Sequence, residues 1–323
     1  MVVTSLQESE TLHFKGNMGA HACAVSIALL YLRLARRWRP FSLLFLRIED
    51  AVEDDAQDAV VAGTEVRMRR VTLIVFGCAL FEHSFDRISL VTSIMKVNHY
   101  ESLRALLDDS LFQRPFAEAF TTAFTHATAT IMAFLYIFND AFVILVSVYI
   151  SMRVESFNGH LDPVLTKKKD VTFWERARRS YDDLAKLTRD ADSYINTNIF
   201  VSFVQNFFFI CFQLLYFLRS ITDEGLLRNT FRIFSFSYVL VRTYMISYFA
   251  AGINDHSKLA RTKLFSVSSR SYCREVHRFL QQAANDEMAV TGCNFFRITR
   301  AFILTVAGTI VTYEVILLQI NPH

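Results

Sequence analysis

Two oppositely charged residues, Asp140 and Arg242, lie deep inside long apolar stretches of the chain. An ionised side chain in the middle of a bilayer is costly, so such residues face the interior of a helix bundle and take a partner. We therefore expect Asp140 to pair with Arg242. Two roles stay open for this pair, because it could contact a ligand or could order two helices without touching one.

Further polar side chains interrupt the same apolar stretches and could bind a small molecule. A ligand pocket between helices is mostly apolar, with a few polar groups that fix the orientation of the ligand. The predicted ligand-binding residues are Tyr136, Asn139, Asp140, Gln205, Asn206, Tyr238, Arg242 and Tyr244. These amides, hydroxyls and charges predict recognition of a ligand, and no covalent chemistry is required of them.

Four ionisable residues gather in another apolar stretch: Glu82, His83, Asp86 and Arg87. Residues four apart are neighbours on a helix, so these side chains share adjoining faces. One His and two carboxylates beside an Arg make a poor site for a divalent ion, and no metal or cofactor is predicted. Ligand contact, cavity lining and structural ion pairing stay open, and ion pairing is favoured.

Long helices must hold these side chains. Crossing about 30 Å of hydrocarbon takes about 20 mostly apolar helical residues. Five stretches qualify, at 71–95, 127–151, 198–218, 231–251 and 301–320. A sixth, at 18–32, is short and lengthens to 18–46 only by crossing a run of arginines. With 52% apolar residues and only 9 Gly and 4 Pro among 323, the chain is predicted to be an all-α, polytopic membrane helix bundle.

The basic residues predict how these helices cross the membrane, since Lys and Arg accumulate in cytoplasmic segments. Three connecting segments, 33–70, 152–196 and 252–300, hold 25 of the 34 Lys and Arg residues. The segments 96–114 and 219–232, which alternate with them, hold 6. The rich segments are therefore expected in the cytoplasm, and the C-terminus outside the cell.

The same pattern divides the chain into regions. Apolar residues recur at helical spacing in 172–196 and 271–284, which predicts that membrane helices continue into a cytoplasmic helical bundle. The expected regions are an N-terminal region 1–70 with the incomplete span and an acidic loop at 49–58, a membrane bundle 71–251 with the cytoplasmic loop 152–196, a cytoplasmic anchor 252–300, and the last span 301–323.

Several classes of protein are disfavoured. A net charge of +3 gives no case for nucleic-acid binding. The five cysteines are scattered and include no C-x-x-C pair. The sequence carries no H-E-x-x-H, G-x-S-x-G or phosphate-loop motif and no repeat interrupted by Gly or Pro, so an enzyme is not predicted.

The end of the chain resembles a known family. Residues 312–320 read TYEVILLQI, in which Thr-Tyr, five largely apolar residues and Gln are similar to the C-terminal signature of arthropod gustatory receptors. Residues 291–296, TGCNFF, look like the segment that precedes the last span in that family. Two departures are Ile320, where the family usually has Phe, and Glu314 within the apolar run. The resemblance covers the C-terminal half best and is weak before about residue 110.

The resemblance implies a gustatory-type chemoreceptor: a tetrameric, ligand-gated, non-selective cation channel in which each subunit contributes its last helix to a central pore. Family members have seven spans and a cytoplasmic N-terminus, so five clear spans leave truncation, divergence or wrong assembly of the N-terminal region open. The implied partners are an external small-molecule tastant, membrane lipid, permeating cations, and identical or related subunits in a homo- or hetero-tetramer at the plasma membrane. A G-protein-coupled receptor and a polytopic transporter or enzyme are the alternatives.

Helical spacing makes the pore hypothesis concrete, because residues three and four apart share one face. The predicted pore and gate residues are Thr312, Tyr313, Ile316, Gln319 and Ile320. A ring of Ile316 or Ile320 side chains could close a conduit by dewetting, and a ring of Gln319 amides offers dipoles to a passing cation. Tyr313 is expected to pack between subunits.

Overall fold

The structure is a computed structural model that describes residues 2–51, 57–105, 115–162, 169–219, 226–269 and 271–320. Side chains are described mainly over 18–46, 63–89, 124–162, 169–215, 229–269 and 271–313. The helices are α1 (Val2–Arg36), α2 (Trp38–Ala51), α3 (Gln57–Ala105), α4 (Pro115–Leu161), α5 (Val171–Arg219), α6 (Leu226–Phe265), α7 (Arg274–Asn285) and α8 (Arg300–Ile320). Strands β1 (Thr291–Gly292) and β2 (Phe296–Arg297) form one short antiparallel hairpin. The all-α prediction is confirmed.

Four helical stretches of the described chain are long and apolar enough to cross a membrane: Met18–Arg36, Phe124–Leu161, Val171–Leu215 and Asn229–Phe265. The last three contain the predicted spans 127–151 and 231–251 and the predicted span 198–218 as far as residue 215. A shorter apolar helix, Arg300–Tyr313, covers part of the predicted span 301–320. The chain is therefore a multi-pass membrane protein.

The spans predicted in the N-terminal half have different outcomes. Of the doubtful stretch, for which the bounds 18–32 and 18–46 were both open, Met18–Arg36 is apolar and long enough to span. The predicted span 71–95 lies inside α3, but the side chains of 90–95 lie mostly outside the described residues, so this span stays a prediction. The side chains of the predicted acidic loop 49–58 lie outside the described residues.

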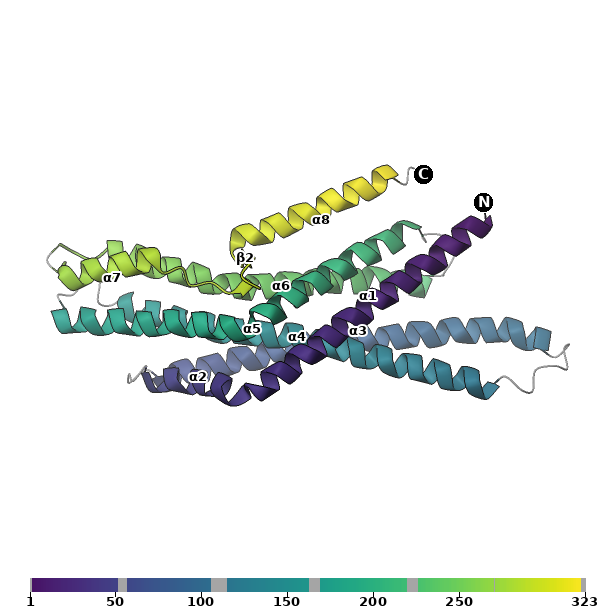
Figure 1. The fold of residues 1–323 in the computed structure, drawn as a ribbon, viewed down its shortest axis with the longest axis horizontal. Coiled ribbons are helices and arrows are strands. Elements are labelled where there is room, and N and C mark those ends of the chain that lie inside the picture. Colours follow the sequence, from purple (N-terminus) through teal and green to yellow (C-terminus); the bar gives the residue numbers. More distant parts are fainter. Residues whose placement is uncertain are drawn as a thin grey trace.

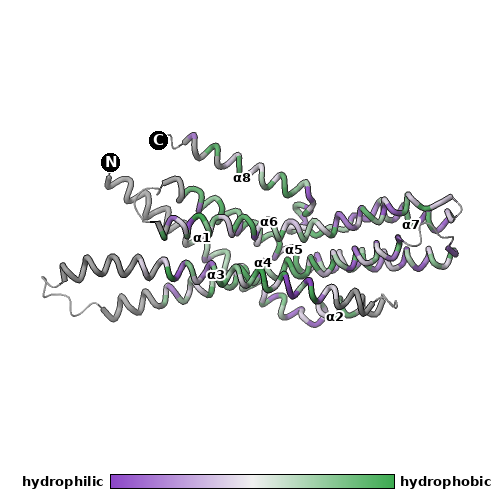
Figure 2. Tube along the Cα trace, turned by 180° about the vertical axis from the view of Figure 1, so that it is seen from behind, coloured by the Kyte–Doolittle hydropathy of each residue, from purple (hydrophilic) through white to green (hydrophobic). Residues whose placement is uncertain are grey.

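Helix α4 is the centre of the bundle and contacts α1, α3, α5 and α6. The long helices run lengthwise, α7 lies against α5 and α6 at one end, and α8 diverges from the other helices after a start near α5 and α6 (Figure 1). The apolar colouring is densest in the middle of the bundle, and polar residues are frequent at the α7 end (Figure 2). This polarity fits a bundle that is partly in lipid and partly in water.

The α7 end has a packed core, as the spacing in 172–196 and 271–284 predicts. Tyr181 from α5 and Phe279 from α7 are both fully buried, and their rings lie 5.3 Å apart. Phe157 from α4 joins them, 5.8 Å from Tyr181. The apolar faces thus pack on each other within one chain. We call this end, formed by α7 with the adjoining parts of α4, α5 and α6, the anchor bundle.

Charged residues fasten α7 to α5 along the edge of the anchor bundle. Glu275 accepts from Arg178 of α5 at 3.2 Å and from Arg278 of its own helix at 2.8 Å. Gln282 donates to Asp182 at 3.0 Å. The hydrogen bond from Arg278 is the main reason that the pKa of Glu275 lies below its ordinary value of 4.5. A lowered pKa means that the ionised form of Glu275 stabilises the folded state.

This sign predicts a pH dependence of stability. The contribution of Glu275 is present above pH 4.5 and is lost as the pH falls through its lowered pKa. Glu275→Gln is therefore expected to lower the unfolding temperature at pH 7 and to have less effect as the pH falls toward 3. Thermal unfolding of both proteins in detergent, measured from pH 7 to pH 3, tests this. A difference that stays constant over that range would show that the charge of Glu275 contributes nothing.

Candidate functional site

The two charged residues predicted to pair do so. Asp140 of α4 is fully buried, Arg242 of α6 is 7% exposed, and Arg242 Nε lies 2.7 Å from Asp140 Oδ2. Both belong to helices long enough to span a membrane. The pair therefore joins α4 to α6 where each helix faces the bundle interior.

Helix α5 completes the network around this pair. Ser202 donates to Asp140 Oδ1, and Asn206 donates to Asp140 Oδ2 at 3.2 Å. The Asn206 side-chain oxygen accepts from Arg242 at 2.7 Å. Each carboxylate oxygen is thus held by partners from the protein itself, which favours a role in ordering α4, α5 and α6 over direct ligand contact for Asp140.

A second layer ties α1 to the same region. Asn139 and Asn198 bond reciprocally, with the Asn198 amide donating to Asn139 Oδ1 at 3.0 Å and the Asn139 amide donating to the Asn198 carbonyl at 3.2 Å. The hydroxyl of Tyr31 also donates to Asn139, at 3.3 Å. Tyr136 donates to the Ala20 carbonyl of α1. Helix α1 is therefore part of the polar core, and neither Tyr31 nor Asn198 was among the predicted site residues.

The polar residues of α3 separate into different contacts instead of forming one centre. Ser235 of α6 donates to Glu82 at 2.9 Å, whereas Arg87 pairs with Asp86 at 3.0 Å and contacts His126 at 2.8 Å. Within the described residues, no three His, Cys, Asp or Glu side chains are grouped so that they could hold a metal ion. The contacts of α3 agree with the favoured interpretation of structural pairing.

Three residues of α5 and α6 have buried side-chain polar atoms without a hydrogen-bond partner in the described part of the chain. The atoms without a partner are the side-chain nitrogen and oxygen of Gln205, the side-chain oxygen of Gln213 and the hydroxyl of Tyr238. The helices meet where Asn206 bonds Arg242 and again where Gln213 bonds Ser235, and Tyr238 lies between those two levels on α6. A buried polar atom without a hydrogen-bond partner costs about 1–3 kcal/mol, so a polar ligand that bonded to these atoms would remove that cost. We call Gln205, Gln213 and Tyr238 the seam groups.

One predicted ligand residue does not join this cluster. Tyr244 is 54% exposed on the outside of α6, where its ring stacks on Tyr248 at a centroid distance of 5.7 Å. The other seven predicted residues, Tyr136, Asn139, Asp140, Gln205, Asn206, Tyr238 and Arg242, all lie in or beside the polar core.

The predicted pore helix leaves most of its surface uncovered within one chain. Thr312 and Gln319 are exposed, Ile316 is 46% exposed and Tyr313 is half-buried, while the side chain of Ile320 lies outside the described residues. Apolar neighbours are also exposed, with Leu304 at 76%. An apolar helix surface of this kind needs lipid or other helices to cover it.

A short hairpin joins α7 to α8 and is clamped to α5. Asp192 accepts from the Thr291 backbone at 2.7 Å and from its hydroxyl at 2.8 Å, and the Cys293 N–H donates to the Asn196 carbonyl at 3.1 Å. Cys293 and Asn294 take positive φ angles of 48° and 61° at the turn. Phe296 of β2 then stacks on Phe302 of α8 at 4.6 Å. The start of α8 is thus fixed to α5 through this joint, which we call the hairpin joint.

Comparison with known proteins connects this architecture to a receptor family. A sequence model described as trehalose receptor matches residues 3–323. The chain belongs to the trehalose receptor family of insect gustatory receptors. The match begins near the N-terminus, so the family relationship extends well beyond the C-terminal half in which the sequence motifs lie.

Several gustatory receptors of Drosophila melanogaster are similar in sequence. The gustatory receptor for sugar taste 64f is 34% identical over 58% of this chain, and that for sugar taste 64a is 26% identical over 93%. The gustatory receptor 5a for trehalose is 28% identical over 59%. This gustatory receptor chain spans 40%, 67% and 43% of the lengths of those relatives. The named relatives are receptors rather than enzymes.

The fold is also that of a solved insect receptor. The olfactory receptor OR5 from Machilis hrabei superposes with a TM-score of 0.68 at 16% identity, over 94% of this chain and 80% of OR5. Its complex with eugenol gives a TM-score of 0.69 at 15% identity. This likeness supports the all-α membrane bundle seen here.

Proposed function

We propose that this chain is a subunit of a gustatory chemoreceptor that works as a ligand-gated, non-selective cation channel, opened by an external small-molecule tastant. The observation that carries the proposal is α8. This helix bears the family's C-terminal signature, diverges from the bundle and exposes apolar side chains such as Leu304 and Val311 (Figure 1). In a homo- or hetero-tetramer with related subunits, four such helices would cover one another around a central conduit.

The residues of α8 fit the two parts of a cation pore. Ile316, and Ile320 one turn further on, would form apolar rings that close the conduit by dewetting. Gln319 would supply a ring of amide dipoles for permeating cations, with Thr312 lining the pore and Tyr313 packing between subunits. We further propose a plasma-membrane location with the anchor bundle in the cytoplasm and the C-terminus outside, with membrane lipid around the outer helices.

The seam groups are the best candidates to recognise the ligand. Gln205 is fully buried and Tyr238 presents a buried hydroxyl, and both lie beside the Asp140–Arg242 pair through Asn206 and the Tyr238–Arg242 ring contact. A polyhydroxylated ligand could satisfy several such groups at once. Relatives named for sugar taste and trehalose support a sugar as the tastant.

The ligand and the pore would communicate through α5. This helix carries Gln205 and Asn206 in the polar core and, nearer its start, Asp192 and Asn196 at the hairpin joint. A ligand that binds the open arrangement more tightly shifts the population toward it. A movement of α5 would then be passed to α8 through the hairpin joint.

The proposed sugar site predicts the effect of removing one polar group. Gln205→Leu keeps the volume but removes the carboxamide, so the sugar concentration for half-maximal current is expected to rise about tenfold, the loss of one or two neutral hydrogen bonds. Stability should be equal or higher, because no unpartnered amide remains buried. Dose–response recordings and thermal unfolding of the same variant test both expectations.

The matched control is Gln281→Leu, which changes an exposed glutamine of α7 in the same way. It should leave the dose–response curve in place. An unshifted curve for Gln205→Leu would remove Gln205 from the ligand site.

A further inference from the structure

Four arginines lie where α1 ends and α2 begins: Arg33, Arg36, Arg37 and Arg39. All four are exposed, and within the described residues none makes an ion pair with a carboxylate. Exposed Arg67 of α3, by contrast, pairs with Glu155 at 3.1 Å. The corner therefore carries positive charge that no carboxylate with a described side chain neutralises.

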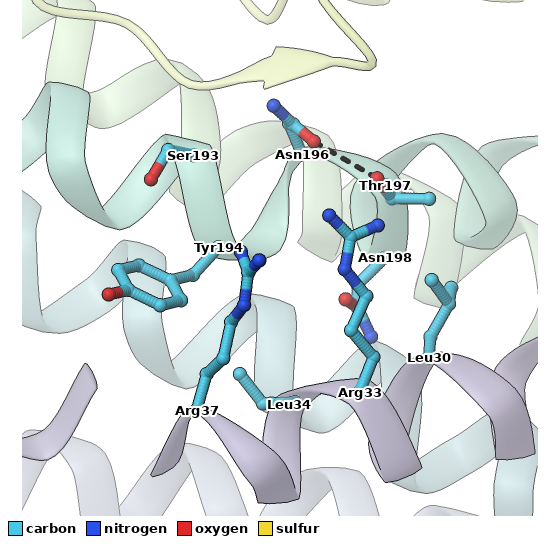
Figure 3. Close-up of a pocket in the computed structure, with 9 residues that line it drawn as sticks. All are labelled: Leu30, Arg33, Leu34, Arg37, Ser193, Tyr194, Asn196, Thr197 and Asn198. Carbon is cyan, nitrogen blue, oxygen red and sulfur yellow. Dashed lines mark hydrogen bonds between the residues drawn. The ribbon is translucent and has the colours of Figure 1, made fainter. Parts of the chain in front are cut away.

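Two of these arginines line a polar cavity against α5. The cavity has a volume of about 180 Å³ and is lined by Leu30, Arg33, Leu34, Arg37, Ser193, Tyr194, Asn196, Thr197 and Asn198. Arg33 and Arg37 rise from α1 toward the polar side chains of α5, and Leu30 and Leu34 form the floor on α1 (Figure 3). Guanidinium groups with nearby hydroxyl and amide groups are the donors that bind phosphate oxygens.

An apolar surface adjoins this cavity. A second cavity of about 350 Å³ is lined by Leu29, Leu32, Arg33, Arg36 and Arg37, so the two cavities share Arg33 and Arg37. Leu29 and Leu32 are 60% and 61% exposed on a stretch of α1 long enough to cross a membrane. The arginines thus lie at the end of a stretch long and apolar enough to span a membrane, next to exposed leucines. A ligand that matches both surfaces has an anionic head and an apolar tail.

From these observations we propose that the cavity between α1 and α5 binds the phosphorylated headgroup of an anionic phospholipid, with Arg33 and Arg37 on the phosphate and an acyl chain along Leu29 and Leu32. This site is separate from the sugar site. It lies beside the hairpin joint, because the carbonyl of Asn196, a residue of the cavity, accepts from Cys293. A bound lipid would hold α1 against α5 at the point from which α8 starts.

The experiment uses the full chain purified in detergent and titrated with dioctanoyl phosphatidylinositol 4,5-bisphosphate, with binding followed by native mass spectrometry. Arg33→Gln/Arg37→Gln is expected to weaken the affinity for the first lipid bound roughly thirty-fold. Each arginine near a membrane surface contributes on the order of fivefold to the affinity, and the two contributions multiply. The control, Arg69→Gln/Arg70→Gln, removes the same charge from exposed residues of α3 that line neither cavity. It should change binding much less.

Equal weakening in the two double variants would overturn the site and leave only general surface attraction. Unchanged binding in Arg33→Gln/Arg37→Gln would overturn it as well. Inositol trisphosphate and inorganic phosphate separate the sources of the phosphate: binding of either as tight as that of the lipid would contradict a lipid site. If the double variant does not fold, Arg37→Gln alone must still weaken binding by about fivefold.

Discussion

Asp140→Ala is expected to destabilise the folded chain by about 3–5 kcal/mol, because it leaves Arg242 as an uncompensated charge inside the bundle. Arg242 is 7% exposed, and its Nε is 2.7 Å from the carboxylate that the substitution removes. Ser202 and Asn206 would lose their acceptor at the same time. Unfolding of the detergent-solubilised protein by titration with a denaturing detergent measures this change.

The double variant Asp140→Leu/Arg242→Met separates charge from packing. Replacing both members of a buried pair by apolar residues is often close to neutral, so this variant should be clearly more stable than Asp140→Ala. Asp190→Ala, at an exposed position of α5, is the surface control and should change stability by no more than about 0.5 kcal/mol. If Asp140→Ala behaves like Asp190→Ala, the pair is not a structural centre.

Asp192→Ala is expected to cost about 2–4 kcal/mol, because two hydrogen bonds to a carboxylate are lost and the Thr291 N–H is left without its acceptor. The consequence for the proposed channel is more specific than the loss of stability. With the hairpin joint loosened, the maximal sugar-evoked current should fall, whereas the sugar concentration for half-maximal binding should change little. Parallel measurements of surface expression, sugar binding and current distinguish these effects.

Asp190→Ala is again the matched control, since it lies two residues earlier on the same helix and does not reach the hairpin. It should leave the current intact. A normal maximal current in Asp192→Ala, at equal surface expression, would mean that the hairpin joint does not couple α5 to α8.

The sequence was sufficient to predict much of the polar core. Asp140 and Arg242 could be paired because a buried charge inside an apolar span has few alternatives. The core of the anchor bundle followed from helical spacing, as Tyr181 and Phe279 confirm. Tyr31 and Asn198 could not be assigned in the same way, because their roles depend on which helices are neighbours, and hydropathy carries no such information.

Other features could not be predicted from the sequence, for physical reasons. Hydropathy leaves the bounds 18–32 and 18–46 open for the first span, because a helix can carry arginines at the end of a span with their charged groups in the headgroup region. Hydropathy alone does not decide whether 71–95 crosses the membrane, because Glu82, Asp86 and Arg87 concentrate charge at its centre. The exposure of Tyr244 depends on how α6 packs, which the residue type does not reveal. The run TGCNFF stands out in the sequence only through its resemblance to the family. Its hydrogen bond to Asp192 joins positions 99 residues apart, and a contact at that separation cannot be predicted from spacing along one helix.

The most direct test of the account is patch recording from cells that express this chain, alone or with a related sugar-taste subunit, in wild-type form and as Gln319→Ala. An epitope after His323, labelled in unpermeabilised cells, confirms surface delivery and an external C-terminus. The account predicts sugar-evoked cation channels whose unitary conductance changes in Gln319→Ala. Sugar-evoked channels of unchanged conductance, or no current from protein that is present at the surface, would contradict a pore lined by α8.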